Sequence, residues 1–249
     1  MAVSTHQVLG TTVTMPVRIR TASALTAMFS VPAPAAQQMV DYTGLEVLQH
    51  LPGRAVVGLV SVRYVDGDLG PYDEFGVAVL VRNHDNPSPR SVGAGLRALV
   101  SGRSGVLIHR LPVNGEFTMA AGRSIWGFPK ELADFETQAS GRRHRVVVRQ
   151  GGRLAVDLSV RSGLPVRTGR SGASLRAYSH PDGVTRFTEW EMRPHGVRTR
   201  PGGARVRLGD HLIGQELAGL GLPRRAMFST TIHDLQMTFG DARDARAST

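Results

Sequence analysis

The 249-residue sequence predicts an α+β fold that is predominantly antiparallel β, with a few flanking helices. Three observations support this class. Apolar and polar residues alternate over many short segments, which is typical of strands with one buried face. Clusters rich in Gly, Pro, Asn and Asp separate these segments, and the chain contains 29 Gly and 14 Pro. Helical spacing of apolar residues is confined to short stretches.

The expected strands follow one another through short connections, which indicates antiparallel neighbours rather than βαβ units. The turn-forming segment DGDLGPYD (66–73) separates the first two strands, and HDNPSPR (84–90) follows the second. From the alternation we expect strands at 54–65, 74–83, 105–111, 143–150, 153–160, 184–192 and 226–239.

Two short helices are also expected. The first opens with Pro34, because proline is favoured in the first turn of a helix. The second follows Asp210, whose carboxylate can cap the helix, and it ends at Gly221. Their apolar faces would consist of Ala36, Met39 and Val40 in the first helix, and of Ile213, Leu217 and Leu220 in the second.

Length and composition predict one globular domain over residues 1–249, with flexible ends at about 1–12 and 240–249. No apolar run approaches about 18 residues, so we expect no membrane-spanning helix and no membrane partner. The N-terminal residues lack the basic start and apolar block of a signal peptide, so we expect a cytoplasmic location. Because the chain has no Cys, disulfides, thiolate nucleophiles and Cys-ligated metals are excluded.

The formal net charge of +10 raises the question of a polyanionic partner. The excess lies in residues 142–207, which contain 15 Arg and four acidic residues. Much of this segment alternates, as in RHRVVVRQ (143–150) and RLAVDLSV (153–160), so we expect the arginines on the solvent-exposed face of a sheet or in an oligomer contact. Few aromatic residues interleave with them and no nucleic-acid-binding module is recognisable, so we expect no nucleic-acid partner.

Several familiar site motifs are absent or lack their context. The segment GAGLRA (93–98) matches G-x-G-x-x-A, but a turn-rich segment precedes it and no βαβ pattern follows. The nine histidines are dispersed, and the nearest two in sequence, His180 and His195, are 15 residues apart. No G-x-S-x-G nucleophile elbow occurs. We therefore expect no metal and no nucleotide cofactor.

Lys130 is the only lysine in the chain; the other 29 basic residues are arginines. It follows Trp126, Phe128 and Pro129, which are apolar and stiff. An amine among such residues is partly desolvated, and desolvation favours the neutral form. A neutral amine can attack a ketone to form an imine, which an always-charged guanidinium cannot do. The alternative is a surface lysine whose neighbours belong to the core.

The segment GRSIWGFPKELA (122–133) resembles the active-site signature of the acetoacetate decarboxylase family. In that family the lysine after the proline forms a Schiff base with the substrate ketone, which implies this role for Lys130. Residues 209–237 are similar to the family's last helix and strand. The resemblance implies a β-barrel or cone, a lyase that acts on a small keto substrate without a cofactor, and a homo-oligomer.

The resemblance also implies further site residues. GPYDEFG (70–76) is similar to the family segment that carries an active-site glutamate, which implies Glu74 as a second catalytic residue. An arginine of the family's first strands touches the substrate, and Arg20 is the better match, with Arg18 the alternative. The other substrate-binding candidates are Tyr72, Arg123, Trp126 and Phe128.

The sequence departs from the family pattern around the lysine. In the decarboxylases a second lysine follows the nucleophile and its charge favours the neutral amine, but here that position is Glu131. If Glu131 faced Lys130 it would stabilise the ammonium form, whereas in an extended segment it faces away. A second family glutamate falls near Leu59, in a segment without acids, and the motif's arginine–glutamate pair is Arg123–Ser124.

Three functions are therefore weighed. The first is decarboxylation of a β-keto acid through an imine on Lys130, with Glu74 moving a proton and Arg20 holding the carboxylate. The second keeps the imine but performs aldol, dehydration or cyclisation chemistry in specialised metabolism, as some relatives of the family do. The third is a non-covalent binding protein or cyclase that uses the apolar cavity alone.

Overall fold

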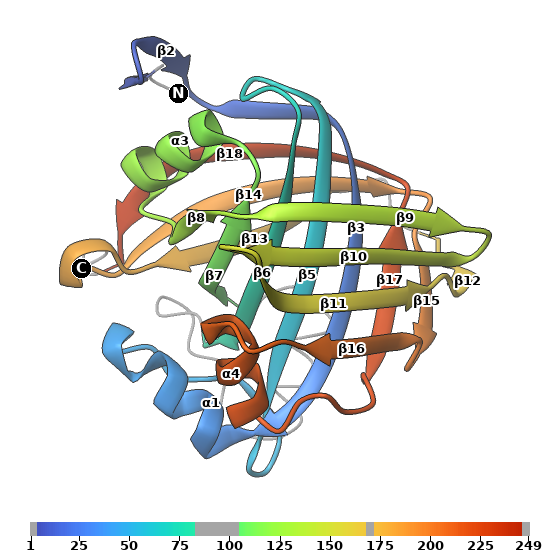
Figure 1. Ribbon diagram of the computed structural model, residues 1–249. Coiled ribbons are helices and arrows are strands. Elements are labelled where there is room, and N and C mark those ends of the chain that lie inside the picture. Colours follow the sequence, from blue (N-terminus) through green and yellow to red (C-terminus); the bar gives the residue numbers. More distant parts are fainter. Residues whose placement is uncertain (1–3, 83–104, 168–171, 246–249) are drawn as a thin grey trace.

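The computed structural model describes residues 4–82, 105–167 and 172–245. The motif at 93–98 and the turn cluster at 84–90 lie outside these ranges. Strands dominate the described chain, and they form a closed barrel, a second sheet and a small N-terminal hairpin (Figure 1). The predicted α+β, predominantly antiparallel class is confirmed.

Seven strands close the barrel, because the last strand in the order pairs back with the first. All neighbouring pairs are antiparallel except β13 and β7. In spatial order the strands are β3 (Val17–Pro32), β18 (Asp234–Asp244), β14 (Arg186–His195), β13 (Ala173–Ser179), β7 (Gly105–Val113), β6 (Tyr72–Val81) and β5 (Arg54–Gly67).

Shorter elements extend or cover the barrel. The barrel sheet continues into β4 (Gln49–Leu51), β17 (Phe228–Ile232), β15 (Arg198–Pro201) and β12 (Leu164–Pro165), and β8 (Lys130–Leu132) lies parallel to β7. The hairpin consists of β1 (Thr5–Val8) and β2 (Thr11–Thr14). The helical segments are α1 (Ala33–Val40), η1 (Asp41–Thr43), α3 (Glu116–Trp126), η2 (Pro181–Gly183) and α4 (Leu212–Gly219).

A four-stranded sheet lies across one side of the barrel (Figure 1). Its strands are β9 (Asp134–Ser140), β10 (Arg143–Gln150), β11 (Arg153–Arg161) and β16 (Ala204–Leu208). The strand β6 is buried on both faces as a result: Phe75 and Val77 pack in a core that includes Val148 and Leu158 of the second sheet, whereas Tyr72 and Ala78 belong to the core inside the barrel. Burial on two faces explains the nearly continuous apolar sequence of β6.

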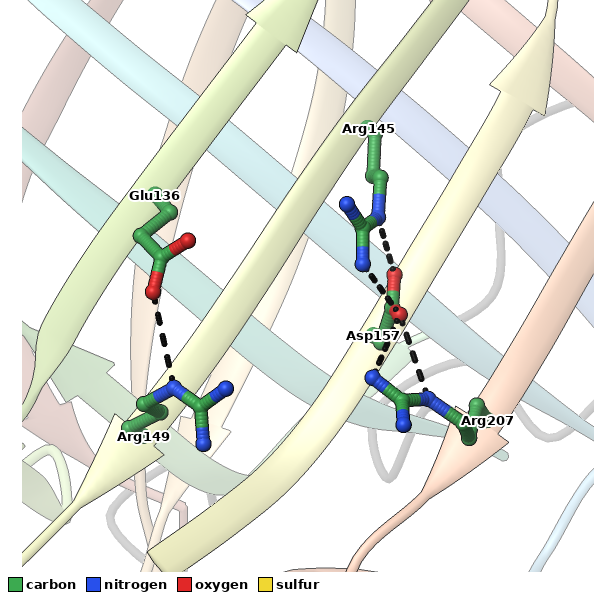
Figure 2. Close-up of polar contacts among 5 residues, drawn as sticks. All are labelled: Glu136, Arg145, Arg149, Asp157 and Arg207. Atoms are coloured by element: carbon green, nitrogen blue, oxygen red, sulfur yellow. Dashed lines mark hydrogen bonds and ion pairs between the residues drawn. The ribbon is translucent and has the colours of Figure 1, made fainter. Parts of the chain in front are cut away.

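The outer face of the second sheet carries the basic residues predicted to face solvent. Figure 2 shows Asp157 between Arg145 and Arg207. Arg145 donates two hydrogen bonds of 2.8 Å to the Asp157 carboxylate, and Arg207 donates two of 3.2 and 3.3 Å. The hydrogen bonds from Arg145 lower the pKa of Asp157 more than its burial raises it. Nearby, Arg149 approaches Glu136 at 3.5 Å.

Most predicted strands are confirmed, with ends shifted by a few residues. The segment 226–239 is corrected, because β17 and β18 are separate strands on either side of His233. The sequence analysis missed the long strand β3. Its pairing with β5 is irregular near Thr21, and the alternation of buried and exposed residues changes from odd to even positions there. It also missed α3, which has no side-chain hydrogen bond at its N-terminal cap and contains Gly122. Small residues weaken the hydrophobic contrast in both elements.

The residue that caps the second predicted helix differs from the prediction. Helix α1 confirms the proline-led helix, but the cap of α4 is His211, whose Nδ1 accepts a hydrogen bond from the Ile213 amide. Asp210 instead approaches Arg153. At the two ends of the described chain, β1 pairs with β2 and β18 continues to Asp244.

Candidate active site

Lys130 is buried inside one end of the barrel, with 3% of the residue exposed. Helix α3 ends at Trp126, and the positive φ of 66° at the following cap residue Gly127 turns the chain back so that β8 begins at Lys130. The Lys130 Nζ lies 2.8 Å from Oε2 of Glu74 on β6 and donates a hydrogen bond of 2.9 Å to Oγ1 of Thr118 on α3. The amine therefore connects β8 and the preceding helix α3 with β6, which is distant from both in sequence.

Two residues of the signature segment explain how the lysine side chain reaches this position. A Cβ atom at Gly122 would lie 2.4 Å from Cδ of Lys130, so the lysine stem crosses α3 where the helix has no side chain. Arg123 Nε donates a hydrogen bond of 2.6 Å to the Lys130 carbonyl oxygen, which fixes the start of β8. The glycine provides space and the arginine holds the backbone.

Glu74 connects the lysine to two stacked tyrosines. Its Oε1 accepts a hydrogen bond of 3.0 Å from the hydroxyl of Tyr64 on β5. The rings of Tyr64 and Tyr72 stack with centroids 4.2 Å apart, and Lys130 Nζ lies 4.9 Å from the centroid of Tyr72. Burial, followed by the nearby Glu74 charge, raises the pKa of Tyr64 and of Tyr72 well above the ordinary value. Both tyrosines therefore remain protonated donors near neutral pH.

Aromatic rings form the opposite wall of the site. Trp126, Phe128, Trp190 and Phe239 contact one another in a closed cycle, with centroids 5.2 to 6.3 Å apart. The cavity between these rings and the lysine measures about 20 Å³, which holds roughly one water molecule. Entry of a larger molecule therefore requires lining side chains to move. The lining residues are Tyr64, Leu69, Tyr72, Glu74, Leu111, Trp126, Phe128, Lys130, Trp190 and Phe239.

The structure brings five of the seven predicted site residues together at this cavity. They are Lys130, Glu74, Tyr72, Trp126 and Phe128. Arg123 contacts the site through the Lys130 backbone and its own side chain does not line the cavity.

Arg20 lies outside the barrel. Its side chain is 50% exposed and forms ion pairs of 2.6 Å with Asp66 and 2.7 Å with Asp68. Alternation along β3 explains this placement, because Val17 and Ile19 face the interior, so Arg18 and Arg20 face outward. The structure therefore does not support either arginine as a contact to a substrate at Lys130.

Two of the three departures around the lysine are also explained. Glu131 faces away from Lys130, as expected for an extended segment, and its Oε2 accepts a hydrogen bond of 2.9 Å from Gln150. Leu59 packs in the core between the two sheets rather than at the cavity. Tyr64, which is also on β5, supplies the polar partner of Glu74.

Sequence reasoning missed five residues that shape the site: Tyr64, Thr118, Gly122, Trp190 and Phe239. Tyr64 lies on a predicted strand, where the parity of its position could have placed it beside Glu74. Thr118 and Gly122 depend on the unpredicted helix α3. Trp190 on β14 and Phe239 on β18 are directly opposite each other where these two strands pair. Such contacts between distant strands have no local sequence signal.

The described residues contain neither a metal-binding cluster nor a membrane-spanning helix. No group of three or more His, Asp or Glu side chains in residues 4–82, 105–167 and 172–245 is arranged to hold a metal ion. None of the described helices combines the length and apolar character needed to span a lipid bilayer.

The fold and the candidate site together are a closed barrel with Lys130 and Glu74 buried at one end. The chain belongs to the acetoacetate decarboxylase family, whose model matches residues 4–245. No match was found among curated proteins.

Solved structures with the same fold include several enzymes. The acetoacetate decarboxylase of Legionella pneumophila aligns with a TM-score of 0.69 and 18% identity, over 92% of this chain and 86% of that one. The enduracididine biosynthesis enzyme MppR, complexed with the condensation product of pyruvate and imidazole 4-carboxaldehyde, aligns with a TM-score of 0.67 and 14% identity over 94% and 90%. An acetoacetate decarboxylase-like enzyme from Sphingomonas wittichii RW1 aligns with a TM-score of 0.64 and 15% identity over 98% and 99%.

Proposed function

We propose that this protein is a lyase that decarboxylates a β-keto acid through an imine on Lys130. The observation that carries the proposal is the 2.8 Å contact between Lys130 Nζ and Glu74 Oε2 inside an apolar cavity. Membership of the acetoacetate decarboxylase family supports the same chemistry.

The contact with Glu74 offers a way to generate the nucleophile without a neighbouring cation. An ion pair taken out of water loses the hydration of both charges. Transfer of one proton from Nζ to Oε2 converts the pair into a neutral amine and a neutral carboxylic acid, which suits the apolar surroundings. Thr118 remains within hydrogen-bond distance of the amine and holds it in place. Glu131, which faces Gln150, takes no part in this step.

The reaction follows from this starting state. The amine of Lys130 attacks the ketone carbon, the carbonyl oxygen takes protons from Glu74 and the amine, and water leaves to give a protonated imine. The bond between the α-carbon and the carboxylate then breaks, and its electron pair moves into the iminium to give an enamine and carbon dioxide. A proton returns to the α-carbon, and water hydrolyses the imine to release the ketone and the free lysine.

Glu74 and Tyr64 would handle the protons. Glu74 lies between the lysine and the Tyr64 hydroxyl, at 2.8 and 3.0 Å. Because the pKa of Tyr64 is well above its ordinary value, this hydroxyl stays protonated and donates a hydrogen bond to Glu74. That donor orients the carboxylate toward the lysine. We assign Glu74 as the general acid and base, and Tyr64 as a positioning residue.

The composition of the cavity wall favours decarboxylation. Among the ten described lining residues, Lys130 is the sole cation and six are aromatic. An apolar wall does not compensate the negative charge of a substrate carboxylate, whereas loss of carbon dioxide removes that charge. The wall therefore disfavours the ground state more than the transition state.

A second candidate is imine chemistry that forms or dehydrates a carbon–carbon framework. The surrounding hydroxyl groups of Tyr64 and Thr118 support it, because they could move protons on a second carbonyl group. The MppR complex with a pyruvate condensation product is an example on the same fold. A third candidate, non-covalent binding, leaves Lys130 without a chemical role.

Reductive trapping tests the proposal. The protein is incubated with acetoacetate or acetone and borohydride, and the adduct is located by peptide mass. Lys130 is the only lysine, so the N-terminal amine is the one competing site, and Lys130→Ala measures its contribution. We expect an adduct at Lys130 and release of carbon dioxide from acetoacetate. An adduct without carbon dioxide release supports the second candidate, and absence of any Lys130 adduct supports the third.

A further inference from the structure

The aromatic cycle contains two tryptophans whose indole N–H groups differ. Nε1 of Trp126 donates a hydrogen bond of 2.8 Å to the Gly240 carbonyl oxygen. Nε1 of Trp190 is buried and has no hydrogen-bond partner within the described part of the chain. Buried N–H groups are almost always paired, and an unpaired one lowers the stability of the fold. Trp190 therefore presents a donor that lacks an acceptor, on a side chain that lines the cavity.

The other polar groups around the cavity are already engaged. The Tyr64 hydroxyl donates to Glu74, and the Thr118 hydroxyl accepts from Lys130. The side chains of Thr118 and Tyr64 act on the Tyr72 hydroxyl and lower the pKa of Tyr72 against the larger opposite effect of burial. Among the described lining residues, Trp190 is the one with a buried side-chain donor that has no hydrogen-bond partner, so its N–H is available to a substrate oxygen.

We propose that Trp190 recognises the carboxylate of the substrate, by donating its Nε1–H to a carboxylate oxygen of the keto acid held at Lys130. This inference rests on the proposed function, because it requires a keto acid at the lysine. Trp190 would thereby distinguish a keto acid from a simple ketone.

The position of Trp190 suits this role. Around the barrel the strands follow in the order β14, β13, β7 and β6, and β8 pairs with β7. Trp190 on β14 is therefore at least two strands away from the strands that position Lys130 and Glu74. The indole therefore comes from a different wall than Glu74 and Lys130, as a contact to the far end of a short keto acid requires.

The chemistry of the donor also suits decarboxylation. An arginine at this point would stabilise the carboxylate charge and so oppose its loss. A neutral N–H orients the carboxylate while leaving most of its charge uncompensated. Orientation matters because the breaking bond must align with the π system of the iminium.

The test compares Trp190→Phe with the wild-type protein in borohydride trapping at Lys130, using acetoacetate and acetone as probes. The substitution keeps an aromatic ring and removes the N–H. We expect the half-saturating concentration of acetoacetate, counted over all Lys130 adducts, to rise roughly 10- to 100-fold, the range for a hydrogen bond to a charged group. That of acetone should not change. Trp126→Phe, which removes a structural N–H, should shift both probes alike.

Each other outcome has a defined meaning. An equal change for acetone and acetoacetate in Trp190→Phe, or no change for acetoacetate, overturns the role of Trp190 and leaves the imine proposal standing. A wild-type protein that binds acetoacetate no better than acetone has the same consequence. If acetone and acetoacetate both fail to label Lys130 in the wild-type protein, the proposed function fails and this inference fails with it.

Discussion

The side chain of Lys130 crosses helix α3 directly above Gly122. A Cβ atom at Gly122 would approach the lysine Cδ to 2.4 Å and Cε to 2.6 Å, closer than van der Waals contact allows. The signature segment thus contains both the candidate nucleophile and the glycine that leaves room for its side chain.

We expect Gly122→Ala to displace the amine of Lys130 from Glu74 and Thr118, because the new methyl group occupies the path of the lysine stem. Trapping of acetone at Lys130 should fall at least tenfold, on the order of the loss caused by misplacing a reacting group by about 1 Å. Gly219→Ala in α4 is the matched control, because its Cβ would meet nothing within 4 Å. Equal trapping by the two variants would contradict the steric explanation.

Glu74→Gln keeps the size of the side chain and removes the group that accepts the lysine proton. We expect the initial rate of imine trapping at Lys130 to fall by roughly 10²- to 10⁴-fold, the usual contribution of a general acid–base residue. Glu136→Gln, on the outer face of the second sheet, should leave the rate unchanged. A Glu74→Gln rate within about twofold of wild type would remove Glu74 from the mechanism.

The raised pKa of Tyr64 predicts that the free energy of unfolding decreases at alkaline pH. Its pKa is raised in the folded protein, so above pH of about 10 the unfolded chain loses a proton that the folded protein retains. The free energy of unfolding should therefore fall by about 1.4 kcal/mol for each further pH unit because of this residue. Urea titrations of wild type and Tyr64→Phe between about pH 9 and 11 measure the difference in slope. Parallel curves would show that Tyr64 ionises normally.

The lowered pKa of Asp157 predicts that the protein loses stability as the pH falls into the acid range. Hydrogen bonds from Arg145 lower the pKa of the folded carboxyl, so its stabilising contribution is present above the unfolded value of about 3.9 and is lost as the pH falls through the folded value. We expect Asp157→Asn to lower Tm by roughly 2–4 °C at neutral pH and to leave Lys130 trapping unchanged. The Tm difference from wild type should shrink in acid. A constant difference across pH would contradict this assignment.

Substitution of Arg20 tests whether the substrate contact implied by the family resemblance occurs in this protein. Because its guanidinium pairs with Asp66 and Asp68 outside the barrel, Arg20→Ala should not change the half-saturating concentration of acetoacetate in the trapping assay. An increase of tenfold or more would mean that Arg20 reaches the substrate. Arg18→Ala, on the same outer face, provides the comparison.

Local patterns were sufficient to predict the fold class and most strands, and to select Lys130 as the candidate nucleophile. Alternation identified β10 and β11, because each has one face in the core between the two sheets and the other toward solvent, so that period-2 burial leaves a direct trace in the sequence. Lys130 was identifiable because it is the only lysine and lies in the family segment that also supplies Gly122 and Arg123.

The tertiary structure decided which residues surround that lysine. Glu74, Tyr64 and Trp190 come from three different strands, and barrel closure through the β3–β5 pairing brings their inner faces together. The same closure placed Arg20 outside, since a phase shift in β3 is set by pairing with β5 rather than by local composition. Strand parity and long-range register, which depend on contacts between distant segments, are therefore what separate the observed site from the expected one.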